Sequence, residues 1–173
     1  MEVFCNGFPK SGNHALVKAV ELLGLPARVN HVPFIGMQTA PINQPHVFIV
    51  RDPRNVIVSW LRFNRKSVTP GTFLAAFRKF QDRPLVEEMA DYAPWLEIGH
   101  VVSYEALIAG PLSMRKMASY LGVPYLEGAW QELPGLTVTW NAVKSDYRSV
   151  WTPAVIKAWY GEGGGELLTR WGY

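Results

Sequence analysis

The chain has 173 residues, of which 49% are apolar, and its formal net charge is +3. This length and composition suit one globular domain with a substantial core, and we expect residues 1–173 to form that single domain. Nucleic-acid-binding proteins usually carry a basic stripe. The small net charge and the absence of a long basic run exclude that class, so no nucleic-acid partner is expected.

Cys5 is the only cysteine, so an internal disulfide is excluded and a reducing compartment is indicated. The sequence shows no signal peptide and no apolar run long enough to span a membrane. We therefore expect a cytoplasmic protein without a membrane partner. Cys5 itself is expected to pack in the interior.

The first predicted elements are a strand at Val3 to Cys5 and an amphipathic helix, with the segment from Cys5 to His14 between them. Apolar residues at helical spacing indicate this helix: Leu16, Ala19, Val20 and Leu23. A loop of small residues before a helix presents backbone N–H groups that lack partners, and the helix dipole adds about half a positive charge there. Lys10 adds a full charge. The loop therefore predicts an anion site, most simply for a phosphate.

The order of residues in this loop differs from that of an ATP-binding P-loop. In the ATP-type loop a lysine follows the second glycine and a hydroxyl residue follows the lysine to bind magnesium. Here Lys10 precedes Gly12, and Asn13 follows the glycine. This order counts against an NTPase, and no metal is expected. On its own, Pro9 to Gly12 is equally compatible with an ordinary surface turn.

A second strand is expected before Asn30, and a third at His46 to Val50, a short apolar run rich in β-branched residues. Asp52 is a good N-cap and Pro53 suits the first helical position, so a helix should follow. Its predicted apolar face comprises Val56, Trp60 and Phe63.

Arg51 closes the third strand, and Ser59 lies about two turns along the helix on roughly the same side. Ligands of open parallel sheets bind outside the carboxyl ends of the strands. The alternative is that Arg51 only closes a strand and that Ser59 has no role.

Later in the chain we predict a strand at His100 to Ser103 and helices at Pro70 to Phe80, Pro84 to Tyr92, Leu112 to Leu121 and Glu166 to Trp171. The glycines from Gly161 to Gly165 are expected to form a flexible connection. Two tryptophans, Trp60 and Trp159, fall in apolar helical patterns and are expected in the core. Three others lie in less regular segments and are alternatives for contacting an acceptor: Trp95, Trp140 and Trp151.

Two of these segments carry a resemblance to a known family. Pro9-Lys10-Ser11-Gly12, directly after a strand, resembles the 5′-phosphosulfate loop of sulfotransferases. Arg51 and Ser59, eight positions apart, resemble the family's 3′-phosphate motif. Weaker matches extend the resemblance over roughly Val3 to Trp151, including Pro70-Gly71-Thr72-Phe73 and the stretch from Lys144 to Arg148.

The resemblance to a shortened cytosolic-type sulfotransferase implies a fold and a donor. The fold is P-loop-like, a three-layer α/β/α arrangement around a central, mainly parallel sheet of about four to five strands. The donor is 3′-phosphoadenosine 5′-phosphosulfate (PAPS) and the product is adenosine 3′,5′-bisphosphate (PAP). The reaction is in-line transfer of a sulfuryl group to a hydroxyl or amine of an unidentified acceptor.

The resemblance also assigns roles to residues. Lys10 would stabilise charge on the bridging oxygen, and His31, followed by Val32-Pro33 as in the family, would accept the proton of the acceptor. An unperturbed histidine pKa near 6.5 suits that role. His14 is more suited to bind the anion or cap the helix, and His46 and His100 are expected to be structural. The residues that would hold the nucleotide are Pro9, Lys10, Ser11, Gly12, Asn13, His14, Arg51, Ser59, Tyr104, Lys144 and Arg148.

The chain also departs from the family pattern. Asn13, His14 and Ala15 stand where the family often has two threonines and an adenine-stacking tryptophan. The family's Arg-Lys-Gly triplet would fall near Trp140 to Ala142 and is absent, so Lys144 or Arg148 would have to supply its charge. Two alternatives stay open: a P-loop kinase of small molecules or nucleotides, and a nucleotide-binding protein without catalysis. Acceptor choice depends on variable loops.

Overall fold

The structure is a computed structural model that describes residues 1–34, 43–133 and 146–173. Its chain divides into two compact units. The first comprises residues 1–51 and 94–143, and the second comprises residues 52–93 and 144–173. The single domain expected from the sequence stays a prediction.

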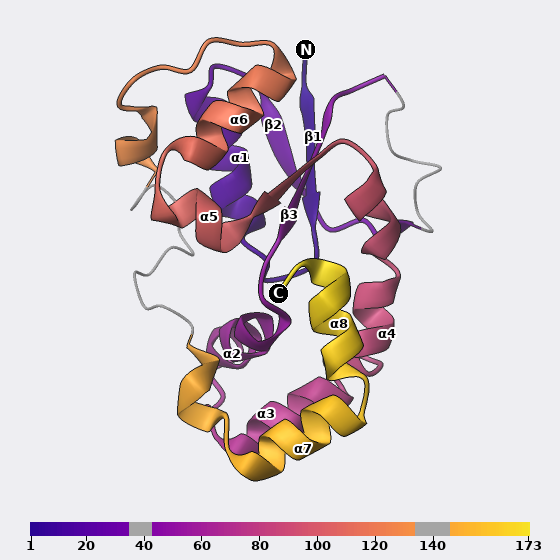
Figure 1. The fold of residues 1–173 in the computed structure, drawn as a ribbon. Helices are drawn as coiled ribbons and strands as arrows, with labels where there is room; N and C mark the ends of the chain where they lie inside the picture. Colours follow the sequence, from indigo (N-terminus) through magenta and orange to yellow (C-terminus); the bar gives the residue numbers. More distant parts are fainter. Residues whose placement is uncertain (35–42, 134–145) are drawn as a thin grey trace. The chain divides into compact units, whose positions relative to one another are not determined.

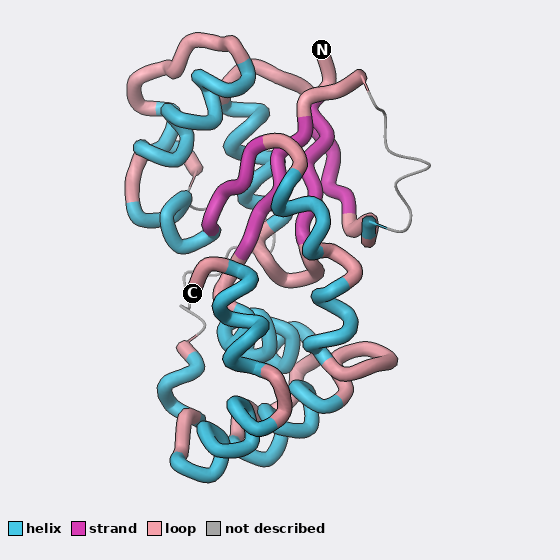
Figure 2. Tube along the Cα trace, turned by 45° about the vertical axis from the view of Figure 1, so that its right-hand side comes forward, coloured by secondary structure: helices cyan, strands magenta, loops and turns pink. Residues whose placement is uncertain are grey.

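The first unit contains a parallel sheet of four strands in the order β2-β1-β3-β4. The strands are β1 (Val3–Gly7), β2 (Ala27–Asn30), β3 (His46–Val50) and β4 (His100–Ser103). Figure 2 shows them side by side in magenta. Because all four run in one direction, their carboxyl ends meet at one edge of the sheet. The predicted α/β class with a central, parallel, four-stranded sheet is confirmed.

Every residue of the central strands β1 and β3 is buried, because both faces of the sheet are covered. On one face Cys5, Ile49 and Val102 belong to an apolar core shared with the helices of this unit. These helices are α1 (Asn13–Leu22), α5 (Tyr104–Ala109) and α6 (Leu112–Leu121) (Figure 1). Burial raises the pKa of the Cys5 thiol to about 12, so this side chain is packing, as predicted.

The other face of the sheet carries a cluster of aromatic rings around Trp95, which lies in the 3-10 helix Ala93–Glu97. The rings of Phe4 and His46 lie 5.6 and 5.5 Å from that of Trp95. Trp95 is only 1% exposed, and its Nε1 donates a hydrogen bond to the carbonyl of Val32 at 2.9 Å. The alternative in which Trp95 contacts an acceptor is not supported, because its ring is enclosed in the core. His46 is structural, as expected. Trp140 lies outside the described residues.

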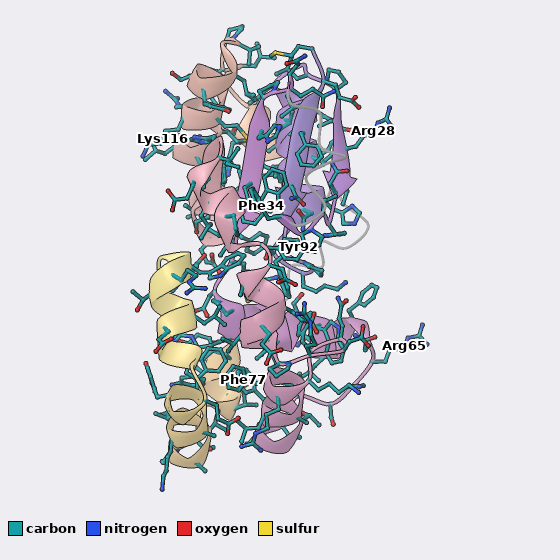
Figure 3. The ribbon with its side chains drawn as sticks, turned by 90° about the vertical axis from the view of Figure 1, so that its right-hand side faces the viewer. Arg28, Phe34, Arg65, Phe77, Tyr92 and Lys116 are labelled. Carbon is teal, nitrogen blue, oxygen red and sulfur yellow. The ribbon has the colours of Figure 1, made fainter. Side chains whose placement is uncertain are left out.

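The second unit is helical. Its helices are α2 (Pro53–Phe63), α3 (Pro70–Arg78), α4 (Leu85–Ala90), α7 (Pro153–Gly161) and α8 (Gly164–Trp171). As predicted, Asp52 caps α2 by accepting a hydrogen bond from the amide of Arg54 at 2.9 Å. In Figure 3 Phe77 lies among these helices, where its ring stacks on Trp159 at 4.4 Å.

Three details of the second unit differ from the sequence prediction. Phe63 is 63% exposed, because it is the last residue of α2, and Ile57 and Leu61 complete the buried face instead. Trp60 is only half-buried. Trp151, which the sequence offered as an alternative for contacting an acceptor, packs edge to face against Phe73 and Trp159.

The glycine-rich segment is a packed turn rather than a flexible connection. Helix α8 begins at Gly164, two residues earlier than predicted, and Gly163 turns the chain with a φ of 88°. A Cβ on Gly164 would lie 2.3 Å from the indole ring of Trp159, so only glycine allows this approach. A Cβ on Gly161, in the same segment, would meet nothing within 4 Å.

We therefore expect Gly164→Ala to lower the free energy of unfolding by about 1–3 kcal/mol, because the added methyl group must displace the Trp159 ring. Gly161→Ala, the matched control in a helix, should be neutral or stabilising by about 0.5–1 kcal/mol. Urea unfolding of both variants measures the difference. Equal stability of the two would contradict the packing described for α7 and α8.

Candidate functional site

The loop between β1 and α1 has an unusual backbone. Lys10 has a φ of 70° and Gly12 a φ of 104°, and the amide of Ser11 donates to the carbonyl of Phe8 at 3.0 Å, closing a tight turn. Gly12 is the N-cap of α1. Among the residues that the structure describes, no side chain caps the helix, and its first turn holds no acidic residue. The positive end of the helix dipole is therefore open to an anion.

Ser11 is the second feature of this loop. Its side chain is completely buried, and within the described residues its Oγ has no hydrogen-bond partner. A buried polar atom without a partner costs about 1–3 kcal/mol, and such atoms are few in folded proteins. The Ser11 hydroxyl therefore marks this loop as a place where a polar ligand atom fits.

Arg51 joins the end of β3 to the same loop. It is 7% exposed, and its Nη1 donates a hydrogen bond to the backbone carbonyl of Lys10 at 3.1 Å. A non-glycine residue with positive φ is uncommon, so this bond supports the strained backbone of Lys10. The structure thus brings together Arg51 and Lys10, which are 41 positions apart in the sequence.

Tyr104, the first residue of α5, completes this group. Its ring lies 4.3 Å from the guanidinium carbon of Arg51. A Cβ on Gly12 would be 2.3 Å from the same ring, so glycine is required at that position. Burial raises the pKa of the Tyr104 hydroxyl above its ordinary value, and the charge of Arg51 opposes that shift. Tyr104 is therefore neutral and holds the guanidinium by a cation–π contact.

His31 follows β2 and reaches the same edge of the sheet. Its Nδ1 lies 3.2 Å from the carbonyl oxygen of Gly7 and 3.3 Å from Nδ2 of Asn13. The pKa of His31 is lowered, first because partial burial of the ring disfavours its charged form, and further by the positive charges of His14 and Lys10. The carbonyl of Gly7 acts in the opposite direction. Burial also lowers the pKa of Lys10. His31 is consequently neutral near pH 7, which is the state a general base needs.

Pro9 and His14 lie in and next to the loop of the first unit, whereas Ser59 and Arg148 belong to the second unit. Ser59 is half-buried on α2. Arg148 is exposed in the 3-10 helix Tyr147–Val150, where it pairs with Asp146 at 3.4 Å. The backbone amide of Tyr147 donates to Oδ1 of Asn55 at 3.3 Å, which attaches the segment of Arg148 to α2. Lys144 lies outside the described residues.

Asn6 is a residue of this site that the sequence analysis missed. It is 1% exposed in β1, and its side chain forms two hydrogen bonds with the backbone of Val32, the residue after His31. A signal was present in the sequence, since an asparagine within an apolar strand needs buried partners.

Residues 1–34, 43–133 and 146–173 contain no group of three or more histidine, cysteine or acidic side chains that could hold a metal ion. Within the same ranges, none of the helices combines the length and the apolar character that crossing a bilayer requires.

The lowered pKa of His31 predicts how stability depends on pH. Its folded pKa lies below the unfolded value near 6.5, so the unfolded state binds more protons between the two values. The stabilisation from His31 is fully present above about pH 6.5 and is lost as the pH falls through the folded pKa. A histidine ring titration followed by NMR should give a midpoint below about 6.5 for His31.

Urea unfolding at about pH 7.5 and about pH 5 should therefore show a smaller loss of stability for His31→Gln than for the wild type. A midpoint at or above the ordinary histidine value would contradict the environment described for His31.

The matches to known proteins come from solved structures and concern the fold. No family model and no curated protein matches the chain. Among solved structures, mouse sulfotransferase SULT7A1 complexed with PAP matches with a TM-score of 0.70 and 16% identity, over 98% of this chain and 84% of that one.

Retinol dehydratase, solved with androsterone and the inactive cofactor PAP, matches with a TM-score of 0.60 and 17% identity, over 76% of this chain. The match spans 62% of retinol dehydratase. The resemblance found in the loop and at the end of β3 thus extends to the backbone, and the chain has the sulfotransferase fold.

Proposed function

We propose that this chain is a sulfotransferase that moves a sulfuryl group from PAPS to a hydroxyl or amine acceptor. One observation carries the proposal: the loop of Lys10, the buried hydroxyl of Ser11 and the guanidinium of Arg51 gather at the carboxyl edge of the sheet. On the same fold, two neighbours hold PAP.

The residues of the first unit fit the charge of this donor. The uncapped start of α1 and Lys10 would bind the 5′-phosphosulfate, and the Ser11 hydroxyl would gain the partner that it lacks. Arg51 would bind the 3′-phosphate, and the Tyr104 ring would lie near the adenine. Three further residues are proposed to bind the same nucleotide: Ser59, Lys144 and Arg148. Pro9, Asn13 and His14 would contact it as parts of the loop.

The donor supplies the sulfuryl group and leaves as PAP. In the transfer, the bond between sulfur and the bridging phosphate oxygen breaks while a bond forms between sulfur and the acceptor oxygen or nitrogen. Lys10 and the loop amides stabilise the charge that grows on the bridging oxygen. His31 takes the acceptor's proton and becomes an imidazolium, and its lowered pKa ensures that it starts neutral.

Nucleotide binding separates this proposal from its two alternatives. Isothermal titration calorimetry should show binding of PAP without magnesium and no comparable binding of ATP, with or without magnesium. Tight binding of magnesium-ATP alone would favour the kinase. Binding of PAP without transfer of labelled sulfate from PAPS to any of a panel of hydroxyl and amine acceptors would favour a binding protein.

In the same titration, Arg51→Ala should weaken PAP binding about 10- to 100-fold, the equivalent of a lost charge-assisted hydrogen bond of about 1.5–3 kcal/mol. Arg51→Lys should bind PAP with an affinity between those of the wild type and Arg51→Ala, because lysine keeps the charge but lacks the planar guanidinium group. Arg28→Ala, which removes a guanidinium with an 81% exposed side chain, is the control. An unchanged dissociation constant for Arg51→Ala would refute the contact.

Turnover tests the two catalytic assignments. His31→Ala should lower kcat about 10²- to 10⁴-fold while PAP still binds, because only proton transfer is removed. Lys10→Ala should lower kcat about 10²- to 10³-fold, with a smaller effect on PAP affinity.

His100→Ala and Lys116→Ala are matched controls outside the site; Lys116 points away from α6 into solvent in Figure 3. Retained activity in His31→Ala would remove His31 from the role of base.

A further inference from the structure

The side-chain amide of Asn13 is oriented by the backbone around it. Asn13 is 3% exposed, and its Nδ2 donates to the carbonyls of Phe8 at 3.0 Å and Gly7 at 3.3 Å. A rotated amide would place its oxygen against these two carbonyl oxygens, which is repulsive. The NH2 group therefore faces the loop. Gly7 makes this seat possible, because a Cβ there would be 2.7 Å from Oδ1 of Asn13.

This arrangement determines which ring nitrogen of His31 carries the proton. Nδ1 of His31 lies 3.2 Å from the carbonyl oxygen of Gly7 and 3.3 Å from the Asn13 amide nitrogen. If Nδ1 were bare, its lone pair would face the oxygen of Gly7. If Nδ1 is protonated, it donates to that oxygen, and the two hydrogens of Asn13 Nδ2 serve Gly7 and Phe8 without conflict. The contacts favour the Nδ1–H form, in which Nε2 carries the lone pair.

A second asparagine fixes the backbone beside His31. Asn6 Nδ2 donates to the carbonyl of Val32 at 2.9 Å, and Asn6 Oδ1 accepts from the amide of Val32 at 3.0 Å. Trp95 donates to the same carbonyl at 2.9 Å. Three hydrogen bonds to one residue leave the chain after His31 little freedom to shift.

We propose that Asn13 and Asn6 are positioning residues for His31. Asn13 holds the carbonyl of Gly7 where it accepts from Nδ1–H, and Asn6 holds the backbone of Val32. Together they present the basic nitrogen, Nε2, in one place and one protonation form. The catalytic meaning of this device rests on the proposed sulfuryl transfer, while the tautomer itself is a property of the protein alone.

The first test needs no substrate. Long-range ¹H–¹⁵N NMR of the histidine rings, recorded above the pKa of His31, distinguishes a protonated Nδ1 from a protonated Nε2. Free histidine prefers the Nε2–H form, so a predominantly Nδ1–H ring for His31 would support the proposal. A predominantly Nε2–H ring in the wild-type protein would overturn it.

Variants of Asn13 then test how much this residue contributes to the tautomer of His31. Asn13→Ala should shift the His31 ring toward the Nε2–H form, because the carbonyl of Gly7 is no longer held where Nδ1–H can donate to it. Asn13→Ser, which keeps one donor, should lie between Asn13→Ala and the wild type. Asn64→Ala, which removes an exposed amide bonded to the carbonyl of Trp60, is the matched control and should leave the ring unchanged. A wild-type tautomer ratio in folded Asn13→Ser or Asn13→Ala would exclude the role of Asn13.

Kinetics separate positioning from nucleotide binding. Asn13→Ala should lower kcat about 10- to 100-fold, as a misplaced group does, and should leave the dissociation constant of PAP within about threefold, because the backbone amide of residue 13 is retained. Loss of PAP affinity with unchanged kcat would contradict the positioning role. If the protein transfers no sulfate at all, the NMR result still decides the tautomer, so failure of the proposed function and failure of this inference are distinguishable.

Discussion

The hydrogen bond from Arg51 to the carbonyl of Lys10 connects the two halves of the candidate site within the first unit. Lys10 adopts a backbone conformation that non-glycine residues rarely occupy, and a buried guanidinium is costly unless it is paired. The hydrogen bond therefore supports the backbone of Lys10 and at the same time gives the buried guanidinium of Arg51 an acceptor. Tyr104 holds the guanidinium from its other side and at the same time covers Gly12. As a result, the loop, the end of β3 and the start of α5 form one assembly whose position depends on a single arginine.

The electrostatics of this assembly serve two opposed requirements. An anion site needs positive charge, which Lys10, Arg51 and the start of α1 supply. A general base in the same place must stay neutral. Partial burial and the neighbouring charges lower the pKa of His31 below its ordinary value, so the charge that would favour an anion also keeps His31 unprotonated. The carbonyl of Gly7 works against this shift and, through its contact with Nδ1, orients the ring.

The elements that the sequence predicts well are those with a strong local signal. Two elements have the predicted bounds: the strand His46–Val50 and the helix Leu112–Leu121. The first is a short apolar run rich in β-branched residues, and the second shows apolar residues at helical spacing. The convergence of Arg51 with the loop also follows from the sequence, since parallel strands share a carboxyl edge. Long-range packing is less predictable. The burial of Trp95 depends on the rings of Phe4 and His46, which lie far away in the sequence. The start of α8 at Gly164 depends on how the chain turns back onto the Trp159 ring of α7, and the contacts of Asn13 with His31 need the fold to exist first.

We propose that a nucleotide phosphate binds at the loop from Phe8 to His14. Backbone amide ¹H–¹⁵N spectra recorded during addition of PAP test this residue by residue. We expect the largest shifts on the amides of Ser11 to His14, with Tyr104 as the next most affected residue. PAP binding that leaves these amides unchanged and shifts others would show that the phosphate binds elsewhere.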